Sequence, residues 1–180
     1  IENTNAENLY YYKFLRIKLS IFDRQNMNDE FLNSLKEFLN QYPKRMEMKV
    51  LIADKYRKLQ NYTEAIKIYT EIMESDENLK NSNILYSRGI SYERINQWEK
   101  AERDFKEALI LNPEDAYILN YLAYSWLDRN KNIPEALDLL KKAIEIEPAD
   151  GYIIDSLGWA YFLVDDIDKS VYFLEKAVSL

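Results

Sequence analysis

Few side chains in this sequence have the type and spacing needed for catalysis or for binding a metal ion. There is no cysteine and no histidine, which removes thiol nucleophiles, imidazole bases and the usual zinc ligands. The densest acidic group is Asp165, Asp166 and Asp168. Its spacing is not that of a calcium-binding loop, and acidic residues just before a helix commonly cap its first turn. We therefore expect a protein that is not an enzyme and that needs no metal ion or cofactor.

The charge balance argues against nucleic acid and membranes as partners. The sequence has 24 Lys and Arg against 31 Asp and Glu, a net charge of −7, and the basic residues are dispersed. Nothing in it forms the basic patch that a phosphate backbone or an anionic lipid surface attracts. No apolar run approaches the roughly 18 residues of a membrane-spanning helix. We expect no nucleic-acid partner and no membrane insertion.

Helical periodicity runs through nearly all of the sequence. Hydrophobic residues make up 47% of it, and there are only three Gly and four Pro, which favours an all-α fold. A helix, a short polar turn and a second helix recur along the chain. The residues that open the second helix are 34, 36, 35 and 34 residues apart: Phe31, Ala65, Ala101, Ala136 and Ser170. A period of this length is typical of a solenoid, in which each helix pair buries its apolar face against the next.

A small residue followed by a large aromatic one recurs at a fixed position in the first helix of the last four pairs, whereas the first pair has Lys18 and Leu19 where a small residue is expected. The small residues are Ala53, Gly89, Ala123 and Gly158, and the aromatic ones are Tyr56, Tyr92, Trp126 and Tyr161. Proline closes several pairs, at Pro43, Pro113 and Pro148. In this pattern the chain resembles the tetratricopeptide repeat family. The small residues let two helices approach closely, while the aromatic residues fill the space toward the neighbouring helix.

The resemblance implies a right-handed α-solenoid of about five helix-turn-helix repeats. The repeats would cover residues 12–45, 46–81, 82–115, 116–150 and 151–180, the last one incomplete, in a single domain over 1–180 that is a fragment of a longer chain. The last two repeats resemble segments of long bacterial repeat proteins, which implies a soluble protein of the bacterial cytoplasm or periplasm. Residues 1–8 are polar and are expected to form a lead-in strand or turn.

Four positions in the turns carry a specific prediction of backbone conformation. Asn26, Asn96 and Asn130 stand where the chain reverses, and Asp165 stands at the matching place in the last pair. Asn and Asp tolerate the left-handed conformation that such a turn requires. Pro134 suits the first turn of a helix, where a missing N–H is no loss.

The resemblance also implies which side chains face a ligand, because the first helix of each tetratricopeptide repeat lines a concave groove. In the first two repeats these positions are mixed in charge: Lys13, Arg16, Ser20, Arg24, Glu47, Asp54 and Lys58. In the last two repeats they are mainly aromatic and also include Leu127. We predict a scaffold that binds a protein or peptide partner mainly there, through Tyr117, Asn120, Tyr121, Tyr124, Tyr152, Asp155 and Trp159. Rigid aromatic side chains give a large contact area at small entropic cost.

Other interpretations of the same residues stay open. The sequence holds 15 Tyr, so compositional bias or packing on neighbouring helices would also place Tyr on these helices. The array could instead be a structural segment, since Val171, Leu174 and Val178 form an apolar stripe on the last helix. Such a stripe invites stacking on further repeats or a homo-oligomer through the C-terminal end.

One kind of peptide ligand is not expected. Chaperone-binding members of the family hold a C-terminal carboxylate with Lys, Asn and Arg side chains. The corresponding positions here are occupied by Arg16, Ser20, Leu51 and Val50, Asp54, Ser87, which do not form that clamp.

Overall fold

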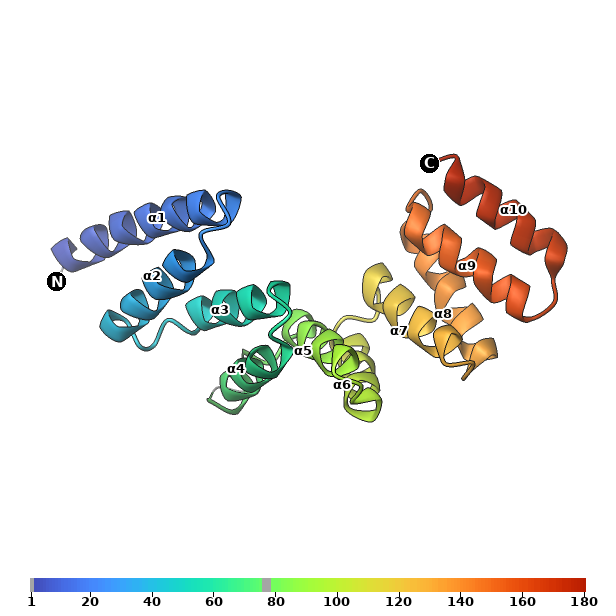
Figure 1. The fold of residues 1–180 in the computed structure, drawn as a ribbon, viewed down its shortest axis with the longest axis horizontal. Coiled ribbons are helices and arrows are strands. Elements are labelled where there is room, and N and C mark those ends of the chain that lie inside the picture. Colours follow the sequence, from blue (N-terminus) through green and yellow to red (C-terminus); the bar gives the residue numbers. More distant parts are fainter. Residues whose placement is uncertain (1, 76–78) are drawn as a thin grey trace. The chain divides into compact units, whose positions relative to one another are not determined.

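The structure is a computed structural model that describes the backbone of residues 2–75 and 79–180, and the side chains of these residues from Tyr10 onward. Within these ranges the chain forms ten α-helices and no strand, joined by short turns (Figure 1). They fall into two compact units, residues 1–79 and 80–180. The all-α, helix-turn-helix fold class predicted from the periodicity is confirmed. None of the described helices is long and apolar enough to cross a membrane.

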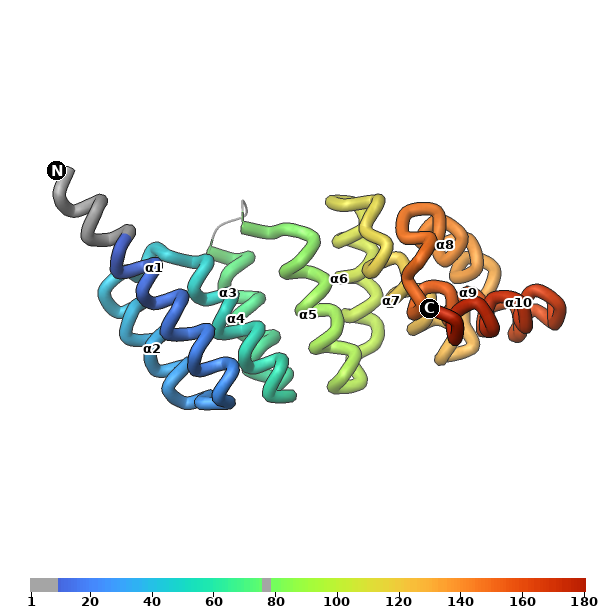
Figure 2. The backbone as a smooth tube through the Cα atoms, turned by 90° about the horizontal axis from the view of Figure 1, so that it is seen from above, coloured from blue at the N-terminus to red at the C-terminus, as the bar shows by residue number. Residues whose placement is uncertain are grey.

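The first unit holds four helices, in which each helix packs on the next along the chain. They are α1 (Glu2–Arg24), α2 (Asn28–Gln41), α3 (Met46–Lys58) and α4 (Tyr62–Ser75). The helices of each pair run antiparallel (Figure 2). The core between them is formed by Leu15, Leu19, Leu35, Phe38, Met48 and Ile52.

The second unit holds six helices, again arranged as consecutive pairs. They are α5 (Ser82–Arg94), α6 (Trp98–Leu111), α7 (Ala116–Asp128), α8 (Ile133–Ile146), α9 (Gly151–Leu163) and α10 (Ile167–Val178). Beyond the contacts within pairs, α7 also contacts α9, and α8 contacts α9. The first helices α7 and α9 therefore lie next to each other, which brings their outward faces onto one surface.

The small residues of the repeat are where the two helices of a pair meet. A β-carbon added to Gly89 would lie 2.6 Å from the ring of Phe105, and one added to Gly158 would lie 2.8 Å from Leu174. Ala53 and Ala123 are completely buried. These distances confirm that the pattern marks close helix contacts, since interiors are packed too densely to accept another methyl group there.

The aromatic residues that follow the small ones pack as the pattern predicts. Trp126 is buried, and its Nε1–H donates a hydrogen bond to Glu102 of α6 at 3.1 Å. Tyr161 is partly buried and stacks on Phe173 with ring centroids 5.5 Å apart. Trp126 thus contacts the preceding helix pair, whereas Tyr161 packs within its own pair, on the helix that Gly158 also meets.

The turn predictions are confirmed at every position. Asn26, Asn96, Asn130 and Asp165 have φ between 52° and 62°. Pro134 lies in the first turn of α8. The next acidic residue, Asp166, accepts a hydrogen bond from the backbone N–H of Lys169 at 3.3 Å, as a helix cap does. In the described residues no group of acidic side chains is placed to hold a metal ion.

Two expectations about the polar segments have different outcomes. The lead-in predicted for residues 1–8 is wrong from Glu2 onward, because α1 begins there. Helical propensity in this polar stretch continues the helix that follows it. The polar composition of residues 74–81 predicts a longer connection between the second and third repeats, but α4 continues to Ser75 and residues 76–78 lie outside the described residues.

A buried ion pair, not predicted from the sequence, joins α5 to α6. Arg88 donates two hydrogen bonds to the Asp104 carboxylate, at 2.7 and 2.8 Å, and Asp104 has no solvent exposure. A bidentate pair of this kind fixes the rotation of one helix against the other. Arg88 is next to Gly89 in the chain. The contact between α5 and α6 therefore combines close steric packing with a hydrogen-bonded ion pair of defined geometry.

The close contact at Gly89 can be tested against a glycine that has space around it. Gly89→Ala should lower the free energy of unfolding by about 1–3 kcal/mol, because the buried Phe105 ring must move. Gly151→Ala is the control: its nearest atom would be 3.6 Å away, so stability should stay unchanged or rise by up to about 1 kcal/mol. Urea unfolding of both variants measures this. Equal losses would contradict the packing described.

Candidate functional site

The predicted site residues lie on the two neighbouring first helices α7 and α9. Tyr117, Tyr124 and Tyr152 are the most open, with exposed fractions of 56%, 45% and 85%. Asp155 is also exposed. Each of these side chains projects from a helix whose opposite face is buried in the core, so the helix holds it in place while leaving it accessible.

Two of the predicted rings are largely occupied in packing. The Tyr121 ring lies 5.3 Å from Phe105 and meets Tyr86 edge-on at 5.6 Å. Burial raises the pKa of the Tyr121 phenol. Trp159 is partly buried and lies 5.1 Å from Tyr124. The Tyr124 and Trp159 rings therefore meet across α7 and α9, whereas Tyr121 connects α7 to the preceding helix pair.

The polar members of the predicted site differ in environment. Asn120 is partly buried, and its Oδ1 is enclosed without a hydrogen-bond donor in the described part of the chain. Tyr117 lies at the start of α7, where the carboxylates of Asp150 and Glu147 raise the pKa of its phenol. Leu127 was expected among the outward positions, and that expectation is wrong: only 2% of it is exposed, because it belongs to the core.

A small hollow of about 270 Å³ lies beside Tyr121 and Tyr124. Charged side chains of α5 and α7 surround it: Glu93, Arg94, Asp128 and Arg129. Arg129 donates to Glu93 at 3.0 Å and lies over the Trp98 ring at 4.2 Å. The predicted aromatic residues thus border a depression with a fixed charged rim, an arrangement that can bind a side chain carrying both apolar and polar groups.

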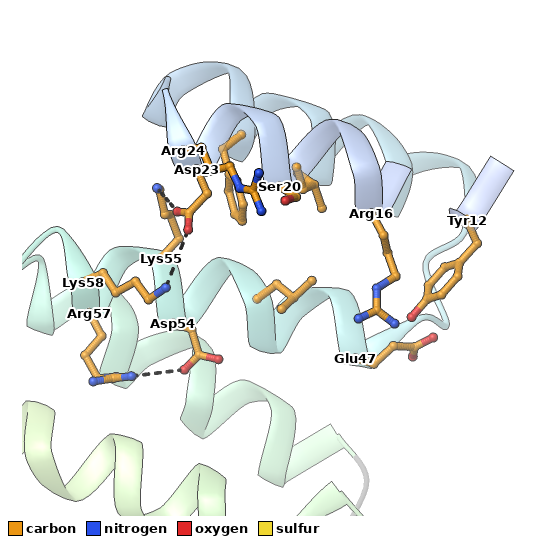
Figure 3. Close-up of a pocket in the computed structure, with 13 residues that line it drawn as sticks. Tyr12, Arg16, Ser20, Asp23, Arg24, Glu47, Asp54, Lys55, Arg57 and Lys58 are labelled. Carbon is orange, nitrogen blue, oxygen red and sulfur yellow. Dashed lines mark hydrogen bonds and ion pairs between the residues drawn. The ribbon is translucent and has the colours of Figure 1, made fainter. Parts of the chain in front are cut away.

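A larger hollow, of about 610 Å³, lies between α1 and α3 (Figure 3). Six of the seven charged or polar positions that the repeat pattern placed outward in the first unit, all except Lys13, line it: Arg16, Ser20, Arg24, Glu47, Asp54 and Lys58. The repeat pattern predicts the direction of these six side chains correctly but indicates no role for them, because their charges are mixed. The signal that it missed is the repetition of Arg16, Ser20 and Arg24 at intervals of four along one helix.

The charges of this hollow, named here the α1/α3 groove, are arranged in pairs at one end. Lys55 is almost fully buried, donates to Asp23 at 2.8 Å and lies over the Phe31 ring at 4.8 Å. The hydrogen bond from Lys55 lowers the pKa of the Asp23 carboxyl. A lysine with such little exposure needs this partner, since an unpaired buried charge is costly.

Two family models described as tetratricopeptide repeat match the chain, at residues 86–151 and 47–79. Together they cover more than half of it. A curated protein, TPR repeat-containing protein PA4667 of Pseudomonas aeruginosa, is 31% identical over 53% of this chain. BBSome complex member BBS4 of Bos taurus is 29% identical over 59% of it. The matches span only 16% and 20% of the lengths of these two relatives.

Solved structures share the fold at low sequence identity. MamA from Desulfovibrio magneticus, residues 41 to its end, has a TM-score of 0.78 with 19% identity and covers 93% of each chain. A tetratricopeptide repeat protein from Parabacteroides merdae has a TM-score of 0.77 with 21% identity, over 93% of this chain and 66% of that one. YrrB, titled a TPR protein with an unusual peptide-binding site, has a TM-score of 0.70 with 17% identity, over 89% and 81%.

The different burial of the predicted tyrosines leads to a stability test. Tyr121→Ala should lower the free energy of unfolding by about 1–3 kcal/mol, because the ring leaves its contacts with Phe105 and Tyr86. Tyr152→Ala is the matched control on an open surface and should change stability by no more than about 0.5 kcal/mol. Thermal and urea unfolding check both. A neutral Tyr121→Ala would mean that this ring is available for a ligand, as the sequence alone predicts.

Proposed function

Since this chain belongs to the tetratricopeptide repeat family, we propose that it is a protein-interaction scaffold that binds a peptide or protein segment on the outward face of its first helices. The aromatic surface is defined here as Tyr117, Asn120, Tyr121, Tyr124, Tyr152, Asp155 and Trp159 on α7 and α9. It is the proposed principal contact. Proteins of this family are generally non-catalytic scaffolds, and the partner of such a fold is a protein or a peptide.

The observation that carries the proposal is the exposure of large rings on two adjacent rigid helices. Tyr117, Tyr124 and Tyr152 expose about half or more of their surface. Covering a ring of this size with a ligand is favourable, because it removes apolar surface from water. Tyrosine has few rotatable bonds, so little entropy is lost when a ligand covers it. Trp159 packs against Tyr124 with ring centroids 5.1 Å apart and so supports one of the exposed rings.

Two further features support peptide binding over other uses of the fold. The hollow beside Tyr121 and Tyr124 has room for one side chain and a charged rim that can orient it. YrrB, whose fold is similar, is described as having a peptide-binding site. A bacterial cytoplasmic or periplasmic setting is part of the proposal, in line with the relative from Pseudomonas aeruginosa.

Peptides selected from a random phage-displayed library provide the probe for this surface. Tyr124→Ala should weaken the selected peptide about tenfold, which corresponds to about 1.4 kcal/mol of lost contact. Its melting temperature should change little, because the ring is half exposed. Fluorescence anisotropy with labelled peptide gives the affinity.

The control is Ile110→Ala, which removes an exposed apolar side chain, 78% exposed, from the second helix α6. Its affinity should equal that of the unmodified protein. An equal loss in both variants, or no loss in Tyr124→Ala, would count against the aromatic surface. Trp126→Ala should instead damage the fold, since that ring is buried.

A second candidate function, self-assembly, is favoured by the apolar side chains of α10. Val171, Tyr172 and Val178 are exposed, Val178 to 90%. Leu174, which was expected in the same stripe, is partly buried and packs over Gly158. The remaining apolar face would bind a second copy of this chain or further repeats, as adjacent repeats do.

Molar mass as a function of concentration separates the two candidates. We expect light scattering to give one constant, monomeric mass, since the exposed stripe is narrower than the sequence indicates. A mass that rises with concentration in the unmodified protein and stays monomeric in Val178→Lys would favour self-assembly through α10. Val178 is the most suitable position because its exposure leaves the fold of a charged variant intact.

A further inference from the structure

The α1/α3 groove carries a positive charge in a protein that is acidic overall. Five cationic side chains line it, Arg16, Arg24, Lys55, Arg57 and Lys58, against three anionic ones, Asp23, Glu47 and Asp54. The lining thus has a formal charge of +2, the difference of five and three, while the whole chain has −7. Local reversal of the net charge attracts ligands of the opposite sign.

The carboxylates of the groove already have cationic partners. Asp23 pairs with Lys55 at 2.8 Å and lies 3.9 Å from Lys58. Asp54 lies 3.8 Å from Arg57, and Glu47 lies 3.2 Å from Arg45 outside the groove. The negative charges are therefore neutralised locally.

Arg16 and Arg24 differ from the other cations in having no acidic partner among the described residues. Both are exposed and extend from α1 toward α3, Arg16 beside Tyr12 at one end of the groove and Arg24 beside Asp23 at the other (Figure 3). A guanidinium in this position can form a bidentate pair with a carboxylate that comes from outside the chain.

The spacing of these two arginines sets the spacing of the anions that would match them. They are eight residues apart on a continuous helix, which is about 12 Å along its axis at a rise of about 1.5 Å per residue. An extended peptide advances about 3.3 Å per residue, and alternate side chains point to the same side. Acidic side chains four residues apart in such a peptide, about 13 Å, would reach both arginines from one face.

Between the arginines the groove has a different chemistry. Leu19 and Leu51 lie there, the former buried and the latter half-buried, and Ser20 offers a hydroxyl. An apolar side chain midway between the two acidic ones would point to the same side and cover Leu51. The groove thus presents cation, apolar surface and cation in the order in which an extended peptide would present acid, apolar residue and acid.

From this arrangement we infer that the α1/α3 groove binds an extended acidic peptide segment of the pattern acidic-x-apolar-x-acidic, with its two carboxylates on Arg16 and Arg24. The inference rests on the proposed scaffold function but uses a different unit of the chain from the aromatic surface. The ligand groups are side-chain carboxylates within a segment, so a free C-terminus is not needed.

The probe is a labelled peptide with the core Glu-Ser-Leu-Ser-Glu, blocked at both ends, measured by fluorescence anisotropy. Arg16→Gln and Arg24→Gln should each weaken it about threefold to fivefold, and the double variant about tenfold or more. Raising the salt from about 0.05 to 0.5 M should weaken binding to the unmodified protein several-fold, and binding to the double variant much less. Lys44→Gln, the loss of an exposed cation outside the groove, should have no effect.

Two more peptides and one more variant make the result specific. A peptide of the same net charge in which the two acidic residues are adjacent should bind the unmodified protein about as weakly as the first peptide binds the double Gln variant. A free C-terminus on the first peptide should not improve its binding. Tyr124→Ala should bind the acidic peptide as the unmodified protein does, which separates this site from the aromatic surface. Equal binding by the unmodified protein and a correctly folded double variant would overturn the inference, as would a loss of equal size in Lys44→Gln.

Discussion

The close approach of the two helices of each pair is the constraint on which the rest of the structure depends. At Gly89 and Gly158 there is no room for a β-carbon, because Phe105 and Leu174 already occupy the space. Where a side chain of one helix packs directly on the backbone of the other, the contacting faces of both helices are buried and form the core of the unit. The opposite face of the first helix then remains exposed to solvent. Outward residues are thereby free to vary without loss of packing.

This separation explains why the two units present different surfaces on one scaffold. In the second unit the outward positions of α7 and α9 carry tyrosines. In the first unit those of α1 carry two arginines, with Leu19 and Leu51 of the groove between them. Tyr121 shows where the separation is incomplete, because its ring also closes the gap between α7 and the preceding pair. A substitution at a residue with both roles changes stability and binding together. Substitutions at the exposed rings therefore give a more direct measure of their contribution to binding.

Most of the fold could be predicted from the sequence, whereas the site could be predicted only in part. The small residues, the left-handed Asn and Asp positions and the capping by Asp166 each follow from local chemistry and were found as expected. The Arg88–Asp104 pair and the burial of Leu127 were not predicted, since each depends on which side chain a neighbouring helix presents. The α1/α3 groove was missed for a related reason: a mixed set of charges becomes a net positive site only when the structure shows which of them are paired.

The central claim is that outward faces of first helices bind a partner while second helices support them. Amide hydrogen exchange by mass spectrometry, with and without a saturating peptide selected from a random library, tests it most directly. The account predicts slower exchange in α7 and α9, or in α1 and α3 for acidic peptides, and unchanged exchange at the exposed ends of α2, α4, α6 and α8. Protection centred on the second helices would contradict it.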